Sequence, residues 1–586
     1  MIVHKIKSAI SVFRQFWGIL SGKFRLQFIL ISLAIVAGAM FETLGVSALL
    51  PFIQALLNPD ELMQNRYVQP FVSFFNIRNT GAFVMLVSLG VVFLYFFKNL
   101  YQVLSNYWQG KFRTNLQGYV SSTLLKSYLH RSYSFFISNN SSALLRNVMG
   151  DANGIMTCVI SMFSVITSGF IISFMFIFLF ITNFTLALGL LLSALLVLII
   201  PVFVLGPPLR DAGDNLRAMD GVCYKYCSQA FQGIKEIIVS HKESYFADEY
   251  RKAYKKKNVY DVKVCVLGRL SANLIETVCI TALILIVAVS VVSGRAVSDA
   301  MVAELGAFAM AAFKLLIAFS GLSTSFNDFI VQYAALSSAY ENLSGVSQLP
   351  VEHAAEAVSF DSSVEFRGIS FAYETNSAHE ILHNVNACIK KGDVIGIKGA
   401  SGAGKTTFVD ILLGLLQPSG GAILLDGTAL TEDNMQSWLK KLSYVPQTAY
   451  LLDDSIRANV AFGVPEPEID DAQVQAVLKE AMLSDYVDAL PDKERTVVGE
   501  RGIQMSGGQR QRLSIARALY TNPEVIIFDE ATSALDEETE KEIMESIDRL
   551  IGQKTLIIIA HRLSTLRKCN KIFEVKDGTV QVSENP

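Results

Sequence analysis

Long apolar runs dominate the first 345 residues and constrain the fold more than any other feature of this chain. Six of them reach the ~20 consecutive apolar residues that a helix needs to cross a bilayer; they cover residues 27–57, 82–108, 155–182, 184–205, 267–293 and 300–325. Of the 586 residues, 51% are hydrophobic and 18% are charged, which is too apolar for a soluble protein of this length. The sequence therefore predicts a membrane region of six transmembrane helices.

The composition changes near residue 345, after which strand-like and helix-like stretches alternate as in an α/β domain. We predict a transmembrane domain over residues 1–345, with two long polar loops at 109–153 and 206–266, and a nucleotide-binding domain over residues 346–586. Basic residues precede the first run, which places the N-terminus in the cytoplasm. Six spans return the chain to that side, so the second domain and both loops are cytoplasmic. The net charge of -3, without a long basic run, predicts no nucleic-acid partner.

A glycine-rich motif in the second domain indicates phosphate binding. Residues 399–406, GASGAGKT, fit G-x-x-x-x-G-K-[ST] between a strand-like and a helix-like stretch. Backbone N–H groups of such a loop surround phosphate oxygens at the N-terminus of the helix. The lysine would reach the β and γ phosphates of ATP, and the hydroxyl of Thr406 would bind Mg²⁺. The predicted ATP-binding residues here are Gly399, Ser401, Gly402, Gly404, Lys405, Thr406 and Thr407.

Two acids end an apolar strand-like stretch at residues 525–530, VIIFDE. Behind a phosphate-binding loop, this pattern predicts that Asp529 holds Mg²⁺ and that Glu530 polarises the attacking water. The alternative is a strand that simply reaches solvent.

The stretch Met505-Ser-Gly-Gly-Gln509 lies just before that strand and resembles the signature of ATP-binding cassette (ABC) transporters. Further stretches stand in the order of that family: FAYE with Tyr373, YVPQ with Gln447, VGERG, SALD with Asp536, and AHRLST with His561. The resemblance covers the whole soluble half, and the six spans fit the exporter subtype. One departure is Met505, where the family most often has leucine.

The resemblance implies roles for these residues. Tyr373 would stack on adenine, although a tyrosine packed in a strand is the alternative. Gln447 would contact Mg²⁺ or the water, and His561 would contact the γ phosphate. The residues matched to contacts with nucleotide at the signature and beyond are Ser506, Gly507, Gly508, Gln509 and Asp536.

The same resemblance implies a dimer, because Ser506 and Gly508 would reach the nucleotide held by a second cassette. This chain carries six predicted spans and one cassette, as a half-transporter does. Its catalytic positions are intact, so a homodimer would have two competent ATP sites. The alternative is a heterodimer with a degenerate partner.

The first span contains FETLGVSALLPFIQAL, which resembles flippases of the PglK type for lipid-linked oligosaccharides. Charged residues within spans mark functional sites by default, and the candidates are Glu42, Lys98, Glu276, Glu304 and Lys314. Lys98 and Lys314 both lie about 15 residues from the outer surface, roughly 22 Å at the rise of a helix. Two cations at that depth suit a cargo phosphate.

Each charge also has a structural interpretation. Lys98 could extend to the inner interface, Lys314 could pair with Glu276 or Glu42, and Glu304 lies near the outer end. We predict an ATP-driven flippase for a lipid-linked oligosaccharide or similar anionic glycolipid in a bacterial inner membrane. The alternatives are an exporter of peptides, hydrophobic drugs, lipid A or phospholipid, and, more remotely, a non-transport ABC ATPase.

Overall fold

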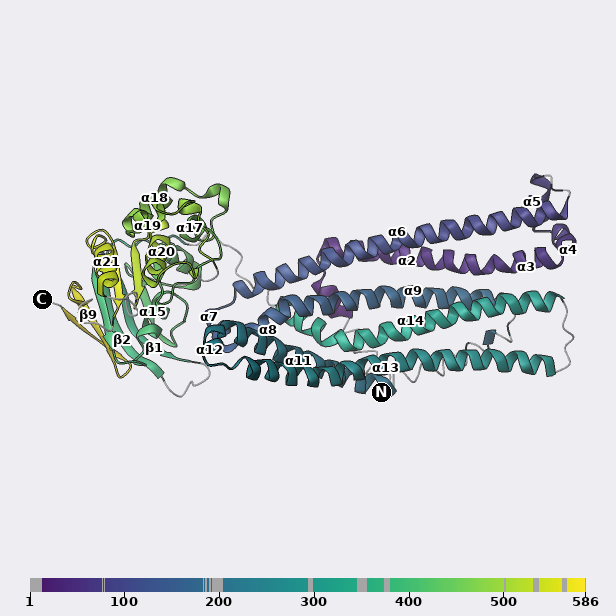
Figure 1. The fold of residues 1–586 in the computed structure, drawn as a ribbon, viewed down its shortest axis with the longest axis horizontal. Coiled ribbons are helices and arrows are strands. Elements are labelled where there is room, and N and C mark those ends of the chain that lie inside the picture. Colours follow the sequence, from purple (N-terminus) through teal and green to yellow (C-terminus); the bar gives the residue numbers. More distant parts are fainter. Residues whose placement is uncertain are drawn as a thin grey trace. The chain divides into compact units, whose positions relative to one another are not determined.

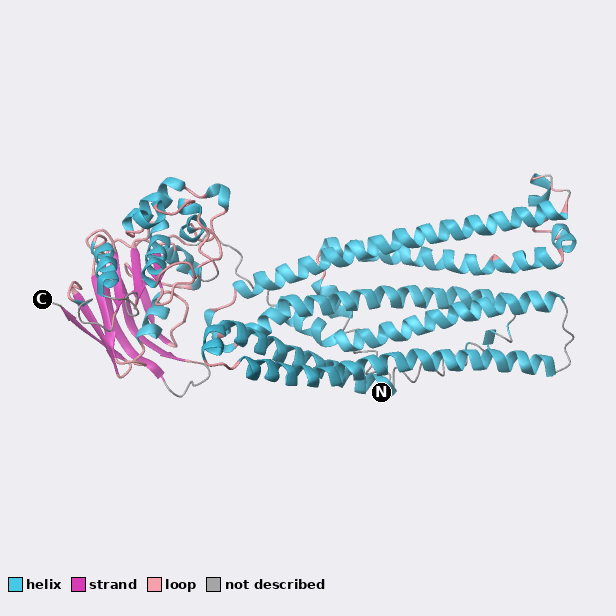
Figure 2. Ribbon diagram, viewed as in Figure 1, coloured by secondary structure: helices cyan, strands magenta, loops and turns pink. Residues whose placement is uncertain are grey.

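The computed structural model describes residues 13–75, 77, 79–182, 184, 187–188, 191, 204–292, 299–344, 356–373, 380–499, 502–530, 537–560 and 566–584. The chain divides into two compact units, one of Met1–Arg131 with Phe136–Leu349 and one of Ser132–Phe135 with Pro350–Pro586. Helices make up the described part of the first unit, whereas the strands belong to the second (Figure 2).

Long helices form the first unit (Figure 1). Two of them, α6 and α13, extend well beyond the length that crosses a bilayer. Helices also occupy much of the stretches 109–153 and 206–266, because the polar ends of α6 and α13 and the whole of α11 lie there. The helices are α2 (Gly22–Ser47), α3 (Leu49–Leu57), α4 (Pro59–Gln64), α5 (Gln69–Phe74), α6 (Thr80–Leu129), α7 (Tyr133–Ser138), α8 (Ser141–Arg146), the π-helix η1 (Asn147–Asp151), α9 (Ala152–Thr182), α11 (Gly206–Gln232), α12 (Ile234–Val239), α13 (Glu243–Val292) and α14 (Asp299–Ser344).

Four described segments are long and apolar enough to span a membrane: Gly22–Leu57, Thr80–Leu129, Ser141–Thr182 and Ala309–Leu343. They overlap the first, second, third and sixth predicted spans. The predicted fifth span lies in α13 as far as Val292. Most of the predicted fourth span, 184–205, lies outside the described residues.

The first span is broken between α2 and α3 at Ala48. Pro51 lies three residues further along and has no backbone N–H, so the carbonyl of Ser47 cannot receive its usual helical hydrogen bond. Kinks in long helices commonly have this cause. The break follows the stretch that carries Glu42 and Gly45, so this part of α2 lies at the end of a helical segment.

Aromatic side chains fill the core where α2, α6 and α9 meet. The rings of Phe28 and Phe163 stack with centroids 5.1 Å apart, and both contact the ring of Phe112. A partly buried ion pair joins η1 to α11, because Arg217 donates to both carboxylate oxygens of Asp151, at 3.1 and 2.6 Å. Such a pair needs both partners, since one charge left alone in the interior is costly.

Two sheets build the second unit (Figure 1). An antiparallel sheet has the order β2-β1-β4-β5, from β1 (Ser363–Ala372), β2 (Glu380–Lys390), β4 (Gly420–Leu425) and β5 (Thr428–Ala429). The larger sheet has the order β10-β9-β3-β8-β7-β6, from β3 (Val394–Gly399), β6 (Leu442–Val445), β7 (Val525–Asp529), β8 (Thr555–Ile559), β9 (Lys571–Lys576) and β10 (Thr579–Glu584).

Five neighbouring strands of the larger sheet are parallel, and only β10 runs against them. Strand β7 is buried along VIIF and β8 along its whole length, as expected of parallel strands covered on both faces. Because parallel strands end at the same edge, the residues that follow β3, β6 and β7 lie near one another. The helices of this unit are α15 (Lys405–Leu412), α16 (Glu432–Leu439), α17 (Ile456–Val460), α18 (Asp471–Glu480), α19 (Ser484–Asp488), α20 (Gly507–Tyr520) and α21 (Glu537–Asp548).

Candidate functional sites

The phosphate-binding motif forms the turn from β3 into α15. Gly404 caps α15 with φ of 102°, a left-handed conformation that glycine adopts without strain. The buried ammonium group of Lys405 donates to the carbonyls of Gly399 and Ala400, at 3.0 and 3.1 Å. Thr406 is exposed in the first turn of α15. The cationic lysine in this loop and the N-terminus of α15 beside it both favour the binding of phosphate groups.

Asp529 ends β7, and its carboxylate accepts a hydrogen bond of 2.8 Å from the hydroxyl of Tyr444 on β6. Burial raises the pKa of Asp529, and the neighbouring charge of Glu530 adds to this shift. The pKa of Asp410 on α15 is raised to about 6, first by burial and then by the charge of Asp529. Among the described residues, this edge of the sheet therefore gathers the acids Asp410, Asp529 and Glu530 around Lys405.

Glu530 follows Asp529 in a left-handed conformation, with φ of 46°. Non-glycine residues rarely adopt it, and such strain is found at functional sites. The backbone N–H of Glu530 donates to the carbonyl of Ile559 at 3.1 Å, and its carboxylate accepts from the amide of Gln447 at 2.7 Å. Gln447 and Glu530, which were matched to catalytic roles, therefore contact each other directly.

The donors present fit a magnesium ion. Mg²⁺ prefers oxygen ligands and takes only one or two of them from protein when phosphates supply others. Asp529 and the hydroxyl of Thr406 would supply such oxygens, and the acids described around them favour a cation. Among the described residues no group of three or more His, Cys, Asp or Glu side chains could hold a metal ion alone, so a metal here would depend on phosphate oxygens.

The signature SGGQ begins α20 and forms a capping box. The hydroxyl of Ser506 accepts from the backbone N–H of Gln509 at 3.2 Å, and the side-chain oxygen of Gln509 accepts from the backbone N–H of Ser506 at 2.8 Å. About one turn into the helix, the amide of Gln511 donates to the carbonyl of Pro446 at 3.2 Å. The signature helix is thus bonded to the segment that carries Gln447.

Tyr373 follows β1 and is half-buried, with its ring edge-to-face against Phe371 at 5.0 Å. It packs on the hydrophobic core of its unit and is only partly buried. His561 and Asp536 lie outside the described residues.

Sequence reasoning did not single out Asp410 or the hydroxyl of Tyr444. No motif joins Tyr444 to Asp529, because the contact comes from the register of two parallel strands, in which Tyr444 pairs with Ile527. A signal was nevertheless present, since Tyr444 stands three residues before Gln447 in YVPQ, a stretch already matched to the family.

In the first unit, Glu42 of α2 contacts both lysines that sequence analysis placed at one depth. Its carboxylate lies 2.8 Å from the ammonium of Lys98 on α6 and 2.5 Å from that of Lys314 on α14. We call Glu42, Lys98 and Lys314 the charge triad. Lys98 does not extend alone to an interface, and Lys314 pairs with Glu42 rather than with Glu276.

Gly45 makes room for this arrangement. A Cβ at Gly45 would lie 3.3 Å from Cδ of Lys98, tighter than nearly all such contacts. The ammonium of Lys98 also lies 4.6 Å from the centre of the Tyr95 ring, a favourable cation–π distance. The spacing of Glu42 and Gly45 in FETLG therefore has a physical role: one helix face offers a carboxylate and, one turn on, the space for its lysine partner.

The remaining charged candidates lie apart from the charge triad. Glu276 is exposed on α13. Glu304 falls in α14, but its side chain is outside the described part of the chain.

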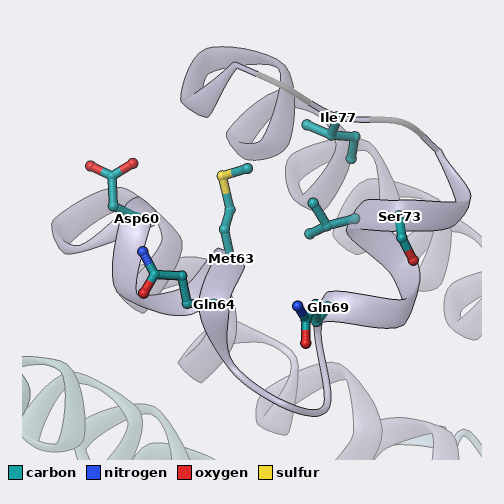
Figure 3. Close-up of a pocket in the computed structure, with 7 residues that line it drawn as sticks. Asp60, Met63, Gln64, Gln69, Ser73 and Ile77 are labelled. Carbon is teal, nitrogen blue, oxygen red and sulfur yellow. The ribbon is translucent and has the colours of Figure 1, made fainter.

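A separate pocket of about 650 Å³ lies between α4 and α5, in the connection between the first two spans. Figure 3 shows Met63 and Ile77 extending into it between polar neighbours. Its lining residues are Asp60, Met63, Gln64, Gln69, Val72, Ser73 and Ile77, among them one acid and no cation. The pocket is therefore poorly suited to phosphate.

Comparison with known families is consistent with both sites. Residues 382–533 match the model of the ABC transporter family, and residues 45–317 match that of the ABC transporter transmembrane region. The chain is 29% identical over 462 residues to an ATP-dependent lipid A-core flippase of Paraburkholderia xenovorans, covering 77% of this chain and 75% of the relative. A protein of the same name in Ralstonia nicotianae is 29% identical over 469 residues, covering 78% and 77%.

Similarity to other relatives is more local. Multidrug resistance protein 1 of Entamoeba histolytica is 39% identical over 218 residues, which cover 37% of this chain and 17% of that protein. Among solved structures, a bacterial Atm1-family ABC exporter with ATP bound has a TM-score of 0.77 at 22% identity, covering 96% of this chain and 95% of the other. That likeness concerns the fold.

Proposed function

The chain is a multi-pass half-transporter of the ABC transporter family, with a transmembrane region and an ATPase domain that couples ATP hydrolysis to transport, and on that premise we propose that its cargo is an anionic lipid-linked oligosaccharide or a similar glycolipid. It flips this lipid across a bacterial inner membrane, from the cytoplasmic side. The active form is a homodimer in which each cassette completes the ATP site of the other, and the nucleotide is bound with Mg²⁺.

The charge triad is the observation that carries this proposal. Within the described part of the membrane region, two lysines and one glutamate leave the triad a net charge of +1 between apolar helices. An uncompensated positive charge at this depth is expensive unless a ligand needs it. A phosphate group on the lipid supplies both the opposite charge and the hydrogen-bond acceptors that lysine prefers. A homodimer would carry two triads, with a net charge matching the two negative charges of a pyrophosphate diester.

The curated relatives favour a second candidate of the same kind. Both matched bacterial proteins are named lipid A-core flippases, so a lipid A-core molecule is the other cargo to test. The PglK-like resemblance of FETLGVSALLPFIQAL favours the lipid-linked oligosaccharide. Both candidates are lipids, and neither requires a peptide or drug site.

Transport in reconstituted vesicles tests the proposal. We expect MgATP to drive movement of an undecaprenyl-pyrophosphate glycan, and Lys98→Ala with Lys314→Ala to lower that movement about tenfold or more, since each charge-assisted hydrogen bond contributes 1.5–3 kcal/mol. Lys111→Ala is the matched control, because Lys111 is an exposed cation nearer the C-terminal end of the same helix α6. Equal transport of a neutral lipid-linked glycan, or undiminished transport by the double variant, would reject an anionic cargo.

A comparison of cargoes then separates the two candidates. Vesicles that contain a lipid A-core molecule in place of the undecaprenyl lipid are assayed in parallel. Transport of the lipid A-core molecule alone would replace the oligosaccharide by the second candidate.

A further inference from the structure

The charge triad is asymmetric in a way that its net charge does not reveal. Lys98 has 8% of its side chain exposed, whereas Lys314 has 28% and Glu42 has 19%. Lys98 is also fixed by the ring of Tyr95 and by the close approach of Gly45. Lys314 has no comparable enclosure among the described contacts. The two lysines therefore differ in access although they share one carboxylate.

Each lysine contacts a different oxygen of Glu42. Lys98 lies against Oε2 and Lys314 lies against Oε1. A carboxylate and a phosphate are both oxyanions that accept charge-assisted hydrogen bonds from an ammonium group. Any phosphate that approaches Lys314 therefore meets a site where a protein carboxylate already occupies the same donor.

We propose that Glu42 is a built-in competitor of the cargo anion: Lys98 anchors one of its oxygens, and Lys314 exchanges between the other oxygen and a phosphate of the lipid. This inference rests on the proposed function and adds a control of affinity to it. Glu42 keeps both cations paired before the lipid arrives, which limits the cost of charges among apolar helices. Glu42 then helps to release the lipid, because its carboxylate can bind Lys314 again in place of the phosphate.

Removal of a competitor should strengthen binding of the anion, whereas removal of a residue that binds the anion weakens it. In Glu42→Gln the amide oxygen can still accept a hydrogen bond from Lys98, but the negative charge that holds Lys314 is gone. An anion then binds more tightly and leaves more slowly. A purely structural Glu42 would show the reverse, with weaker binding as the triad falls apart.

Binding of farnesyl pyrophosphate to the full-length protein in nanodiscs tests this idea, with farnesol as the neutral probe of equal chain length. For Glu42→Gln we expect the dissociation constant of farnesyl pyrophosphate to fall about tenfold, as expected when one opposing charge is removed at contact distance, while farnesol binding stays unchanged. Glu243→Gln, which removes an exposed carboxylate at the start of α13 and outside the triad, is the matched control and should change neither.

Transport gives a second readout. Glu42→Gln should lower both the lipid concentration for half-maximal transport and the maximal rate, because release becomes slow. Unchanged or weaker binding of farnesyl pyrophosphate by this variant would overturn the inference. If Glu42→Gln does not fold, the double variant Glu42→Gln with Lys98→Gln takes its place. It keeps Lys314 and the net charge of the wild-type triad, and it leaves no buried lysine without a partner. That double variant should bind farnesyl pyrophosphate at least as tightly as wild type, and weaker binding would overturn the inference equally.

Lys314→Gln separates this inference from the proposed function. If farnesyl pyrophosphate binds Lys314→Gln as well as it binds wild type, the triad is not an anion site and the anionic cargo fails with it. If Lys314→Gln loses binding but Glu42→Gln does not gain it, only the competitor role fails.

Discussion

The two sites of this chain carry opposite surpluses of charge. At the edge of the larger sheet, Asp410, Asp529 and Glu530 outnumber Lys405; in the membrane region, Lys98 and Lys314 outnumber Glu42. A surplus of one sign in a partly dehydrated place is unfavourable by itself and is relieved by a ligand of the other sign. The comparison therefore suggests a cation for the first site and an oxyanion for the second.

The sites also differ in how they are built. Strand ends and helix caps, which are local features of the chain, position the residues of the cassette. The charge triad joins helices that are 272 residues apart in sequence at Lys314 and Glu42, so no short motif describes it. The following variants test both differences.

Glu530→Gln should have the largest effect. We expect ATP hydrolysis to fall about 100-fold or more, because the variant lacks the carboxylate that would act as general base, while ATP still binds. Phosphate release and binding of labelled ATP measure the two steps. Glu468→Gln, at an exposed glutamate of the same unit, is the control. Hydrolysis at the wild-type rate would remove Glu530 from its assigned role.

Gly45→Leu tests the charge triad without changing any charge. The added side chain would collide with Lys98 and separate it from Glu42, and overpacking of this kind costs about 1–3 kcal/mol. Thermal unfolding in detergent should show the loss of stability. Gly90→Leu on α6 is the matched control, because no atom lies within 4 Å of a Cβ at that position. Equal stability of the two variants would contradict the close contact between Gly45 and Lys98.

Tyr444→Phe tests the acid surplus at the cassette. Loss of the hydroxyl removes the hydrogen bond that orients Asp529, and a bond to a charged group contributes 1.5–3 kcal/mol. We expect about tenfold more Mg²⁺ to be needed for half-maximal nucleotide binding by Glu530→Gln protein. Tyr450→Phe, at an exposed tyrosine nearby, should leave that requirement unchanged. The same Mg²⁺ requirement in both tyrosine variants would show that the hydroxyl does not position Asp529.

Asp410→Asn should have the smallest effect, a rise of a few degrees in the midpoint of thermal unfolding near neutral pH. The pKa of Asp410 is raised from 3.8 to about 6 in the folded protein. A raised pKa favours the folded state below pH 3.8, and this contribution is lost as the pH rises through 6. The stabilisation by Asn should therefore grow between about pH 4 and pH 6 and then level off. The exposed Asp453→Asn is the control, and its difference in unfolding midpoint from wild type should not change with pH. The same pH-independent difference for Asp410→Asn would be inconsistent with burial of this charge.

Much of the architecture followed from sequence pattern. The apolar runs and the alternating soluble half predicted a helical membrane region with an α/β nucleotide-binding domain, and the family matches confirm that fold class. Motifs such as GASGAGKT and SGGQ are predictable because a turn and a capping box involve residues close in sequence. The roles assigned to individual residues of the sites stay predictions.

Contacts between distant elements were harder to predict. Sequence analysis offered Lys314 two glutamate partners, and helix periodicity alone could not choose between them, since the choice depends on which helices pack together. The bond from Tyr444 to Asp529 depends on strand register, and the raised pKa of Asp410 depends on burial. No local sequence pattern predicts these three features.

The shared carboxylate of the charge triad has a consequence for how this protein can evolve. A lineage that replaces Glu42 by a neutral residue leaves two neighbouring cations without their common partner, and one that loses both lysines leaves an isolated acid among apolar helices. Positions 42, 98 and 314 should therefore drift together rather than singly. Related exporters are expected to fall into groups that keep all three charges or none, and a change of group should accompany a change in the charge of the lipid they carry.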